Sequence, residues 1–261
     1  ADGAPNLSET IVYLFVIGIC FFLRFSFAYG AVAYGQSAKT STEFGDTSTT
    51  IAITFSSPVT SGGAVCGAAT YRNITGNVAS VTDNQSNTYT VARNFDGSDQ
   101  AGIATFYALN ITNAPTVVTV TYSLVMDFRA GVIIEASGVK TSAALDQETA
   151  QWQAAPGTGT DAVTSGAVTT TENGEFICGF AAVTNVFTAN TLTAGTNYTE
   201  RQETSPTLGI DLAGETLVQS SAGSIAATWT QSANNNTSTA IMTFKEQAAG
   251  TTAPRRSVII Q

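Results

Sequence analysis

The sequence predicts an all-β protein: two tandem, internally duplicated antiparallel β-sandwich units of jelly-roll or immunoglobulin-like type, preceded by an apolar N-terminal helix. The first observation is composition, since 11% of the 261 residues are charged and 43% are hydrophobic, whereas an ordinary domain has about 25% charged residues. The second is a series of short β-branched and aromatic runs separated by Gly, Asn, Asp and Pro. The third is that the order of these runs recurs in the second half.

Seven strand-like runs follow one another beyond Ser41. They cover residues 49–55, 63–71, 78–83, 87–93, 103–109, 116–123 and 131–137. In the run TVVTVTYS, Val118, Val120 and Tyr122 alternate at period two, which places them on one face of a strand. No window shows a sustained helical period, so the pattern favours an antiparallel sandwich or jelly roll over an α/β fold.

The second half matches the first in four places, in the same order, at a displacement of about 110 residues, and such a repeat indicates a repeated structural unit. The matched segments are 62–71 with 174–183, 81–93 with 192–201, 117–123 with 224–230, and 131–136 with 240–246. The predicted organisation is an apolar N-terminal segment (1–40), a first sandwich (41–140), a linker or extra strand (141–161), a second sandwich (162–247) and a C-terminal tail (248–261).

The succession of these motifs carries a resemblance. In order they read SVTDNQSNTYT, VTVTYS, VIIEASGV, SAALD, GAVTTTENGEFICG, FTANTLTAGTNYTER and STAIMTFKE. This succession resembles a widespread type of secreted bacterial β-sandwich domain, over about residues 45–247 and without the apolar front. The resemblance implies a sandwich fold and export, and it brings no catalytic residues.

The apolar block at residues 10–38 has three interpretations. Its charge-free run from Thr10 to Leu23 is short for a membrane span, which needs about 20 residues, and matches the apolar region of an export signal. Ala31-Val32-Ala33 resembles a cleavage site. However, residues 1–9, which would be basic in an export signal, contain Asp2 and Glu9. The block is also rich in aromatic residues, which suits a helix packed between subunits. Export segment, assembly helix and membrane anchor all place the remainder outside the cytoplasm.

Charge and histidine content exclude several function classes. The chain has a net charge of −9 and no histidine, which argues against nucleic-acid binding and removes Ser-His-Asp catalysis and histidine metal sites. No motif for an enzyme stands out, and no cofactor is expected.

Three cysteines occur, Cys20, Cys66 and Cys178, so at most one intrachain disulfide is expected. Cys66 and Cys178 occupy the same position in the two repeats. Separate sandwiches, the architecture we favour, predict that each stays a free thiol in its own core. One merged sandwich would instead bring the two sulfurs within bonding distance.

Two groups of polar residues are candidate sites. The segment NFDGSDQ offers Asn94, Asp96, Ser98 and Asp99 as weak calcium ligands, although the same residues commonly form turns. Glu172 with Glu175, and Asp127 with Glu135, are carboxylate pairs of the kind that glycosidases use. The simpler interpretation is acids at turns and strand edges, with no catalytic or metal site.

Sugar chemistry suggests two further sets of residues. The candidate N-glycosylation sites are Asn73, Asn84, Asn110, Asn197 and Asn235. The aromatic side chains that would stack on a sugar if they are exposed are Phe95, Tyr107, Trp152 and Tyr198.

These observations favour an extracellular, non-enzymatic structural or adhesive protein. We expect a self-associating subunit of a cell-surface layer or pilus-like filament, with the apolar segment packed between subunits and membrane contact through residues 10–34 as a further option. The expected assembly residues are Ile11, Phe15, Ile17, Phe21, Phe25, Val258 and Ile259. The alternative is a secreted carbohydrate-binding module that recognises surface glycans. A hydrolase with a carboxylate pair is a third interpretation.

Overall fold

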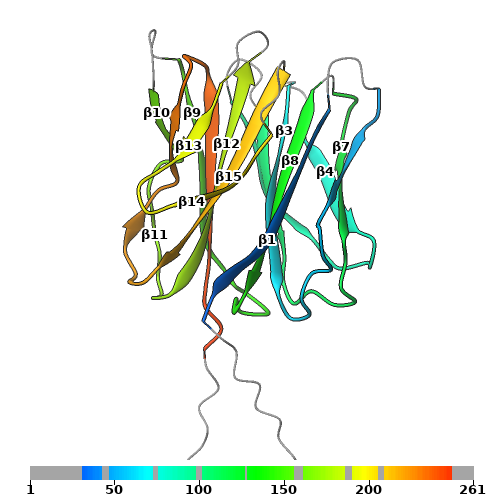
Figure 1. Ribbon diagram of the computed structural model, residues 1–261, viewed down its shortest axis with the longest axis vertical. Helices are drawn as coiled ribbons and strands as arrows, with labels where there is room; N and C mark the ends of the chain where they lie inside the picture. The colour runs from blue at the N-terminus through cyan, green and yellow to red at the C-terminus, as the bar shows by residue number, and fades with distance from the viewer. Residues whose placement is uncertain are drawn as a thin grey trace, which may run out of the picture. The chain divides into compact units, whose positions relative to one another are not determined.

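Antiparallel sheets stacked in layers make up the body of the protein (Figure 1). The computed structural model describes residues 31–42, 47–72, 76–97, 102–126, 128–155, 161–185, 190–204 and 209–248. These residues belong to one compact unit, Tyr29–Ala248. The prediction of an all-β, antiparallel sandwich-like fold is confirmed, and the predicted N-terminal helix lies outside the described residues.

The first half of the body is a five-stranded sheet in the order β1-β8-β3-β6-β5, facing a three-stranded sheet in the order β2-β7-β4. The strands are β1 (Ala33–Thr42), β2 (Thr50–Thr54), β3 (Ala64–Tyr71), β4 (Val78–Asp83), β5 (Thr90–Asp96), β6 (Gly102–Ala108), β7 (Val117–Tyr122) and β8 (Arg129–Ser137). Their apolar core includes Ile53, Phe106 and Val120.

The second half has a five-stranded sheet in the order β9-β18-β12-β15-β14, covered by the sheets β10-β17-β13 and β11-β16. The strands are β9 (Leu145–Gln153), β10 (Asp161–Thr164), β11 (Val168–Thr169), β12 (Glu175–Asn185), β13 (Leu192–Ala194), β14 (Thr199–Glu203), β15 (Gly209–Gln219), β16 (Ser224–Ile225), β17 (Thr228–Gln231) and β18 (Thr237–Phe244). Two smaller clusters, around Trp229 and Ile241, form its outer core.

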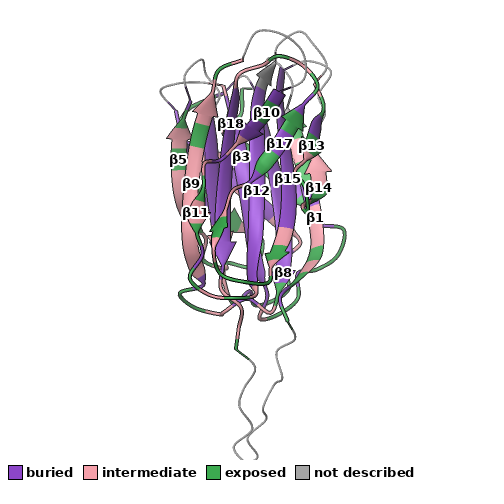
Figure 2. Ribbon diagram, turned by 90° about the vertical axis from the view of Figure 1, so that its left-hand side faces the viewer, coloured by how far each residue is buried: buried purple, intermediate pink, exposed green. Residues whose placement is uncertain are grey.

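The two five-stranded sheets pack face to face in the middle of the body. Every residue of β3 and β18 is buried (Figure 2). Strands β2 and β7 of an outer sheet instead alternate buried and more exposed residues. Alternation is typical of a sheet with one solvated face, and continuous burial is typical of a sheet covered on both faces. The shared core between the inner sheets includes Val132, Phe180 and Met242.

Cys66 of β3 and Cys178 of β12 form a disulfide across this shared core, with their Cα atoms 7.0 Å apart. The expectation of two free thiols is therefore wrong, although each half does have a core of its own. Successive side chains of a strand point to opposite faces. Both cysteines lie on the face directed toward the other half and belong to the shared core, so separate sandwiches do not exclude the bond.

Polar contacts join the edges of the two inner sheets. At one edge Arg93 of β5 forms a two-pronged ion pair with Glu148 of β9, at 2.5 and 2.7 Å. At the other edge Gln202 of β14 donates to the Ser37 hydroxyl of β1 at 3.0 Å, and the Arg201 guanidinium lies 3.8 Å from the centre of the Tyr34 ring. The two halves are thus held together by the shared core, the disulfide and both edges.

Two boundaries differ from the predicted organisation. Residues 33–40, assigned to the apolar segment, lie in β1, which pairs with β8 from Ala33 opposite Ser137 onward. Residues 141–161, predicted as a linker or extra strand, contain the strand β9, which is an edge strand of the second inner sheet, so the second half begins well before residue 162. Both strands are poor in large apolar residues, and pairing with a buried neighbour determines their conformation.

Both ends of the described chain lie at the same end of the body. Ala33 pairs with Ser137, and Glu246 forms a bridge with Val139, only two residues further along. Figure 1 shows the two ends of the ribbon side by side below the sheets. In the part of the chain that the structure describes, we find no helix with the length and hydrophobicity needed to span a membrane.

Candidate functional site

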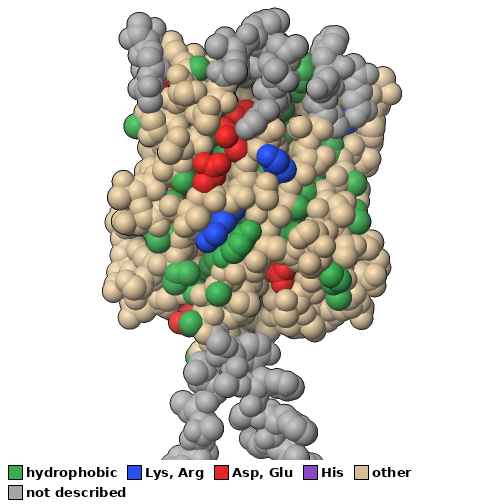
Figure 3. Space-filling model, in the orientation of Figure 1, with side chains coloured by type: hydrophobic (Ala, Val, Ile, Leu, Met, Phe, Trp, Pro, Cys, Tyr) green, Lys and Arg blue, Asp and Glu red, His purple; other side chains and the backbone are tan. Residues whose placement is uncertain are grey.

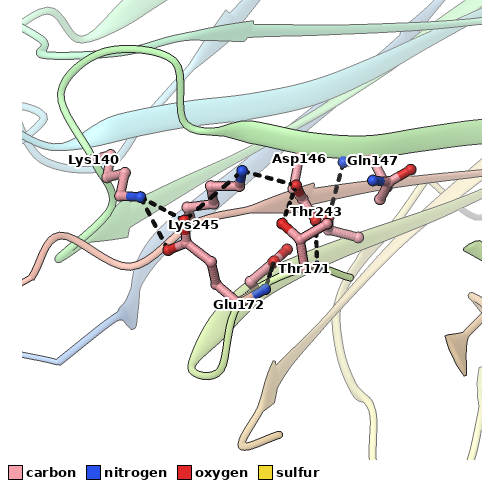
Figure 4. Close-up of polar contacts among 8 residues, drawn as sticks. Lys140, Asp146, Gln147, Thr171, Glu172, Thr243 and Lys245 are labelled. Carbon is pink, nitrogen blue, oxygen red and sulfur yellow. Dashed lines mark hydrogen bonds and ion pairs between the residues drawn. The ribbon is translucent and has the colours of Figure 1, made fainter. Parts of the chain in front are cut away.

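A cluster of charged side chains lies where β9 begins, where β18 ends, and at the turn before β12 (Figure 4). Asp146 is in β9, Lys245 directly follows β18, and Glu172 and Glu175 flank the turn. Strand β9 has an irregular register here, because Leu145 pairs with Phe244 and Gln147 with Thr243. This β-bulge leaves Asp146 without a strand partner, and an extra residue of this kind can direct a side chain away from the regular ladder.

Asp146 is the centre of the cluster. Its Oδ1 lies 3.0 Å from the Lys245 Nζ and accepts a hydrogen bond from the Thr171 hydroxyl at 2.6 Å. Its Oδ2 accepts the Thr171 backbone N–H at 2.7 Å. The Asp146 side chain is 4% exposed and that of Lys245 is 23% exposed, so water has little access to the carboxyl group.

Glu175 is a fully buried carboxyl group beside Asp146. Its Oε1 accepts the Glu172 backbone N–H at 3.1 Å. Burial raises the pKa of Glu175, and the neighbouring Asp146 carboxylate raises it further, against hydrogen bonds from Thr243 and the Glu172 amide that lower it. Glu175 therefore retains a proton more readily than an ordinary glutamate.

Asp146 has the opposite tendency. Burial alone would raise the pKa of Asp146, but hydrogen bonds from Thr171 and Lys245, together with a hydrogen bond involving Glu175, outweigh it and lower the pKa to about 2. The same contact with Asp146 raises the pKa of Lys245. The cluster thus combines an aspartate of lowered pKa, a lysine of raised pKa and a buried glutamate of raised pKa.

Glu172 and Glu175, predicted as a carboxylate pair, are neighbours but do not face each other across an open site. The Glu172 carboxylate accepts hydrogen bonds from the Lys140 Nζ at 2.8 and 2.9 Å and lies 3.8 Å from the Lys245 Nζ. Figure 4 marks a contact from each lysine amine to this carboxylate, and it shows the Lys245 amine directed toward Asp146. Because Glu175 has no exposed surface, a sugar cannot reach it, and this geometry does not support a glycosidase.

The residues that sequence reasoning missed here are Asp146 and Lys245. They are far apart in the chain, and no motif connects them. The available signal was an acid and a lysine at the ends of two otherwise uncharged strand-like runs, SAALD and IMTFK, in a chain with few charges. Of the other predicted pair, Glu135 accepts the Thr60 amide and the Gln36 amide side chain, and Asp127 lies outside the described residues.

A second group of acids lies between β14–β15 and the outer strand β13. Burial raises the pKa of Glu215 to about 8, against hydrogen bonds from the amides of Gly195 and Thr228. Burial and the neighbouring Asp211 raise the pKa of Glu203 to about 7. Glu200 also has a raised pKa, because of burial and the charge of Asp211, while Lys39 of β1 opposes the rise.

The predicted calcium ligands are used within the fold where they are described. The Asn94 side chain forms both hydrogen bonds with the backbone of Val78, at 3.0 and 3.1 Å. The Asp96 carboxylate accepts the Tyr71 hydroxyl at 2.9 Å. Ser98 and Asp99 lie outside the described residues. Among the described residues, no three Asp, Glu, Cys or His side chains converge as a metal-ligand group.

The candidate sugar-stacking aromatics are largely engaged in packing. Phe95 and Tyr107 pack against the shared core, and Tyr107 makes an edge contact with Phe244 at 5.6 Å between ring centres. Tyr198 packs against an outer core and donates its hydroxyl to the carbonyl of Ala226. Trp152 is half-buried in the edge strand β9.

The candidate glycosylation sites differ in accessibility. Asn110 and Asn197 are exposed, in turns where their φ angles are 53° and 72°. The Asn84 side chain is exposed but accepts the amides of Thr116 and Val117. Asn235 is half-buried. Asn73 and all seven predicted assembly residues (Ile11, Phe15, Ile17, Phe21, Phe25, Val258 and Ile259) lie outside the described residues.

The described surface carries few charges and few large apolar side chains. On the face seen in Figure 3, basic and acidic side chains lie near one another around the middle, and hydrophobic ones are scattered. Among the described residues, the large exposed hydrophobics are Leu124, Val125 and Val218. Compared with protein-family models, with curated proteins and with solved structures, the chain matches none.

Proposed function

We propose that the protein is an extracellular, non-enzymatic structural subunit that associates with itself at a cell surface. The observation that carries the proposal is that both ends of the body lie beside residues 137–139. The apolar runs at 10–23 and 257–260 are therefore both attached to the same end of a braced β-body. This arrangement suits a subunit whose flanks make the contacts between copies.

The nature of the body supports the same proposal. Scattered single apolar side chains on the described surface do not form the contiguous patch that a self-associating face needs. The apolar flanks are better suited to make contacts between subunits. The disulfide is of a kind that persists outside the cytoplasm. The half-buried state of the candidate aromatics gives a carbohydrate-binding module less support.

The two halves are, in this proposal, duplicated copies of one unit. The inner-sheet orders β1-β8-β3-β6-β5 and β9-β18-β12-β15-β14 correspond strand by strand, as do β2-β7-β4 and β10-β17-β13. Ile134 lies opposite Cys66 and Met242 opposite Cys178, and each first strand has a bulge at the same place. Duplication explains why two cysteines at equivalent positions meet across the shared core.

Removal of residues 1–30 tests the proposal. This boundary leaves β1 intact, because its pairing begins at Ala33. We expect the full chain to polymerise and the truncated chain to remain monomeric, with the same far-ultraviolet circular dichroism. Analytical ultracentrifugation and negative-stain microscopy measure the difference. Polymerisation of the truncated protein to the same extent as the full chain would overturn the assembly role of this segment.

A further inference from the structure

The cluster around Asp146 contains the three groups needed to form an amide between two side chains. An amine and a carboxyl group lie 3.0 Å apart, on the first and last strands of the second half. The buried carboxyl group of Glu175 lies next to this pair, because Asp146 accepts the backbone N–H of Thr171 and Glu175 accepts that of the following residue, Glu172. We infer that Lys245 and Asp146 condense spontaneously to an isopeptide bond, with Glu175 as the proton relay.

Proximity supports the reaction. The Lys245 Nζ is held 3.0 Å from Oδ1, which is bonded to the Cγ atom that the amine attacks. Holding two reacting groups in contact converts a bimolecular step into an intramolecular one, which supplies much of the barrier reduction in many reactions. Asp146 is held from two directions, by the Thr171 backbone N–H on Oδ2 and by the Thr171 hydroxyl on Oδ1. The side chain is 4% exposed, so little water is present to reverse the condensation.

The step balances without any further reactant. The Lys245 ammonium transfers a proton to the Asp146 Oδ1, which leaves a neutral amine and a neutral carboxylic acid. The amine lone pair attacks Cγ, the C–N bond forms, and the carbonyl electron pair moves onto Oδ2. The Thr171 N–H, 2.7 Å from Oδ2, stabilises this developing charge as an oxyanion-hole donor does.

Glu175 completes the proton transfers. It gives its proton to the departing Oδ1 and takes one from the attacking nitrogen, so that it ends in its starting state. The Cγ–Oδ1 bond breaks, water leaves, and the carbonyl at Oδ2 reforms. One ammonium and one carboxylate become one neutral amide and one water molecule. A neutral, hydrogen-bonded amide is also easier to bury than an ion pair.

The first half shows that the fold does not need these charges. The register of the two inner sheets shows which residues of the first half are equivalent to the cluster. Gly35 is equivalent to Asp146, Gly63 to Glu175 and Ser137 to Lys245. The space is filled by the carboxylate of Glu135, which would lie 3.0 Å from a Cβ atom on Gly35. Packing alone therefore does not account for a lysine, an aspartate and a glutamate together.

Intact-protein mass spectrometry of the folded, disulfide-reduced chain tests the inference. We expect a mass lower than the sequence mass by one water molecule. Trypsin should then fail to cleave after Lys245, and the fragment should carry the Asp146 peptide as a branch. A folded wild-type protein at the full sequence mass, with a free Lys245 peptide, would overturn the inference. This result is independent of whether the protein polymerises.

Three variants separate the bond from a purely structural role. Lys245→Arg keeps the ion pair but cannot condense, so it should regain the full sequence mass. Glu175→Gln should slow or abolish the mass loss while it preserves side-chain volume. Lys140→Arg is the matched control, because Lys140 contacts Glu172 but not Asp146, and it should keep the mass loss. Persistence of the mass loss in Lys245→Arg would contradict the assignment.

Discussion

The two halves differ in the polar side chains that they place below the bulge of the first strand. In the first half, the space below the bulge of β1 contains one buried carboxylate, Glu135, which accepts the Thr60 amide at 2.7 Å and the Gln36 side chain at 2.8 Å. In the second half, the space below the bulge of β9 contains Asp146, Lys245 and Glu175. Neutral donors satisfy the first site, whereas the second combines charges of both signs.

A second pair of equivalent positions shows the same contrast. Phe106 of β6 lies opposite Gly67, and Glu215 of β15 lies opposite Gly179, so the two residues correspond. Both are fully buried. The first half thus has an aromatic ring where the second has a carboxyl group. One backbone arrangement accommodates both, and we therefore expect sensitivity to pH to reside in the second half.

The largest expected effect follows from removing the bond that joins the halves. The variant Cys66→Ala with Cys178→Ala opens a loop of 112 residues, and loss of such a disulfide typically lowers the free energy of unfolding by about 2–5 kcal/mol. Chemical denaturation followed by tryptophan fluorescence measures this loss. Because Trp152 and Trp229 both lie in the second half, circular dichroism should be recorded in parallel to report on both halves. An unchanged unfolding midpoint would contradict the prediction.

A smaller effect is expected at the neutral site of the first half. Glu135→Leu removes the acceptor of the Thr60 amide and of one Gln36 side-chain N–H. Both hydrogen bonds are part-buried and Gln36 also donates to the Ser57 carbonyl, so the expected loss is at the lower end of the about 1–3 kcal/mol typical of a buried unsatisfied donor. Glu135→Gln is the matched control, since its amide oxygen can still accept one of the two hydrogen bonds. Urea denaturation should rank stability as wild type, then the glutamine variant, then the leucine variant. Equal stability of the two variants would show that these hydrogen bonds contribute little.

The smallest expected effect is the change in the free energy of unfolding per pH unit. Glu203 and Glu215 have folded-state pKa values of about 7 and 8, above the unfolded value of about 4.3. The native state therefore binds more protons, so their contribution is complete below the unfolded pKa and is lost as pH rises through 7 and 8. Each such carboxyl contributes at most about 1.4 kcal/mol per pH unit. Calorimetric melting temperatures should fall between about pH 5 and 8.

Glu215→Gln should flatten this pH dependence, because it removes the titrating group and keeps an acceptor for Gly195 and Thr228. In a chain in which Asp146 and Lys245 have not condensed, the Asp146 carboxyl acts in the opposite direction. Its pKa of about 2 lies below the unfolded value, so its contribution is present above about pH 4 and is lost on acidification. A melting temperature that rises from pH 5 to 8 would contradict the assignment of the raised pKa values.

The fold class could be predicted from the sequence because local patterns determine it. Val118, Val120 and Tyr122 alternate in the sequence and lie on the buried face of β7 in the structure. Strand β1, with the sequence AYGQSAKTST, has no such alternation, and the hydrogen bonds of β8 determine its pairing. Local sequence does not report a partner that lies about a hundred residues away.

The candidate site was less predictable for the same reason. Glu172 and Glu175 attracted attention because they are close in sequence, but the reactive arrangement is that of Glu175 with Asp146 and Lys245. The repeat shows that Cys66 and Cys178 are equivalent. It does not show that both side chains face the core shared by the two halves, which is why the prediction of free thiols is wrong. A strand buried on both faces presents its alternate residues to two different cores, and the sequence alone does not distinguish the two.

The central position of the two inner sheets has a consequence for biosynthesis. A nascent chain that has emerged only through β8 has the inner face of its first sheet without a cover, and Cys66 on that face is still a thiol. Until β12 follows, the only other cysteine already synthesised is Cys20. Correct pairing of Cys66 with Cys178 therefore depends on completing the second half before Cys66 is oxidised.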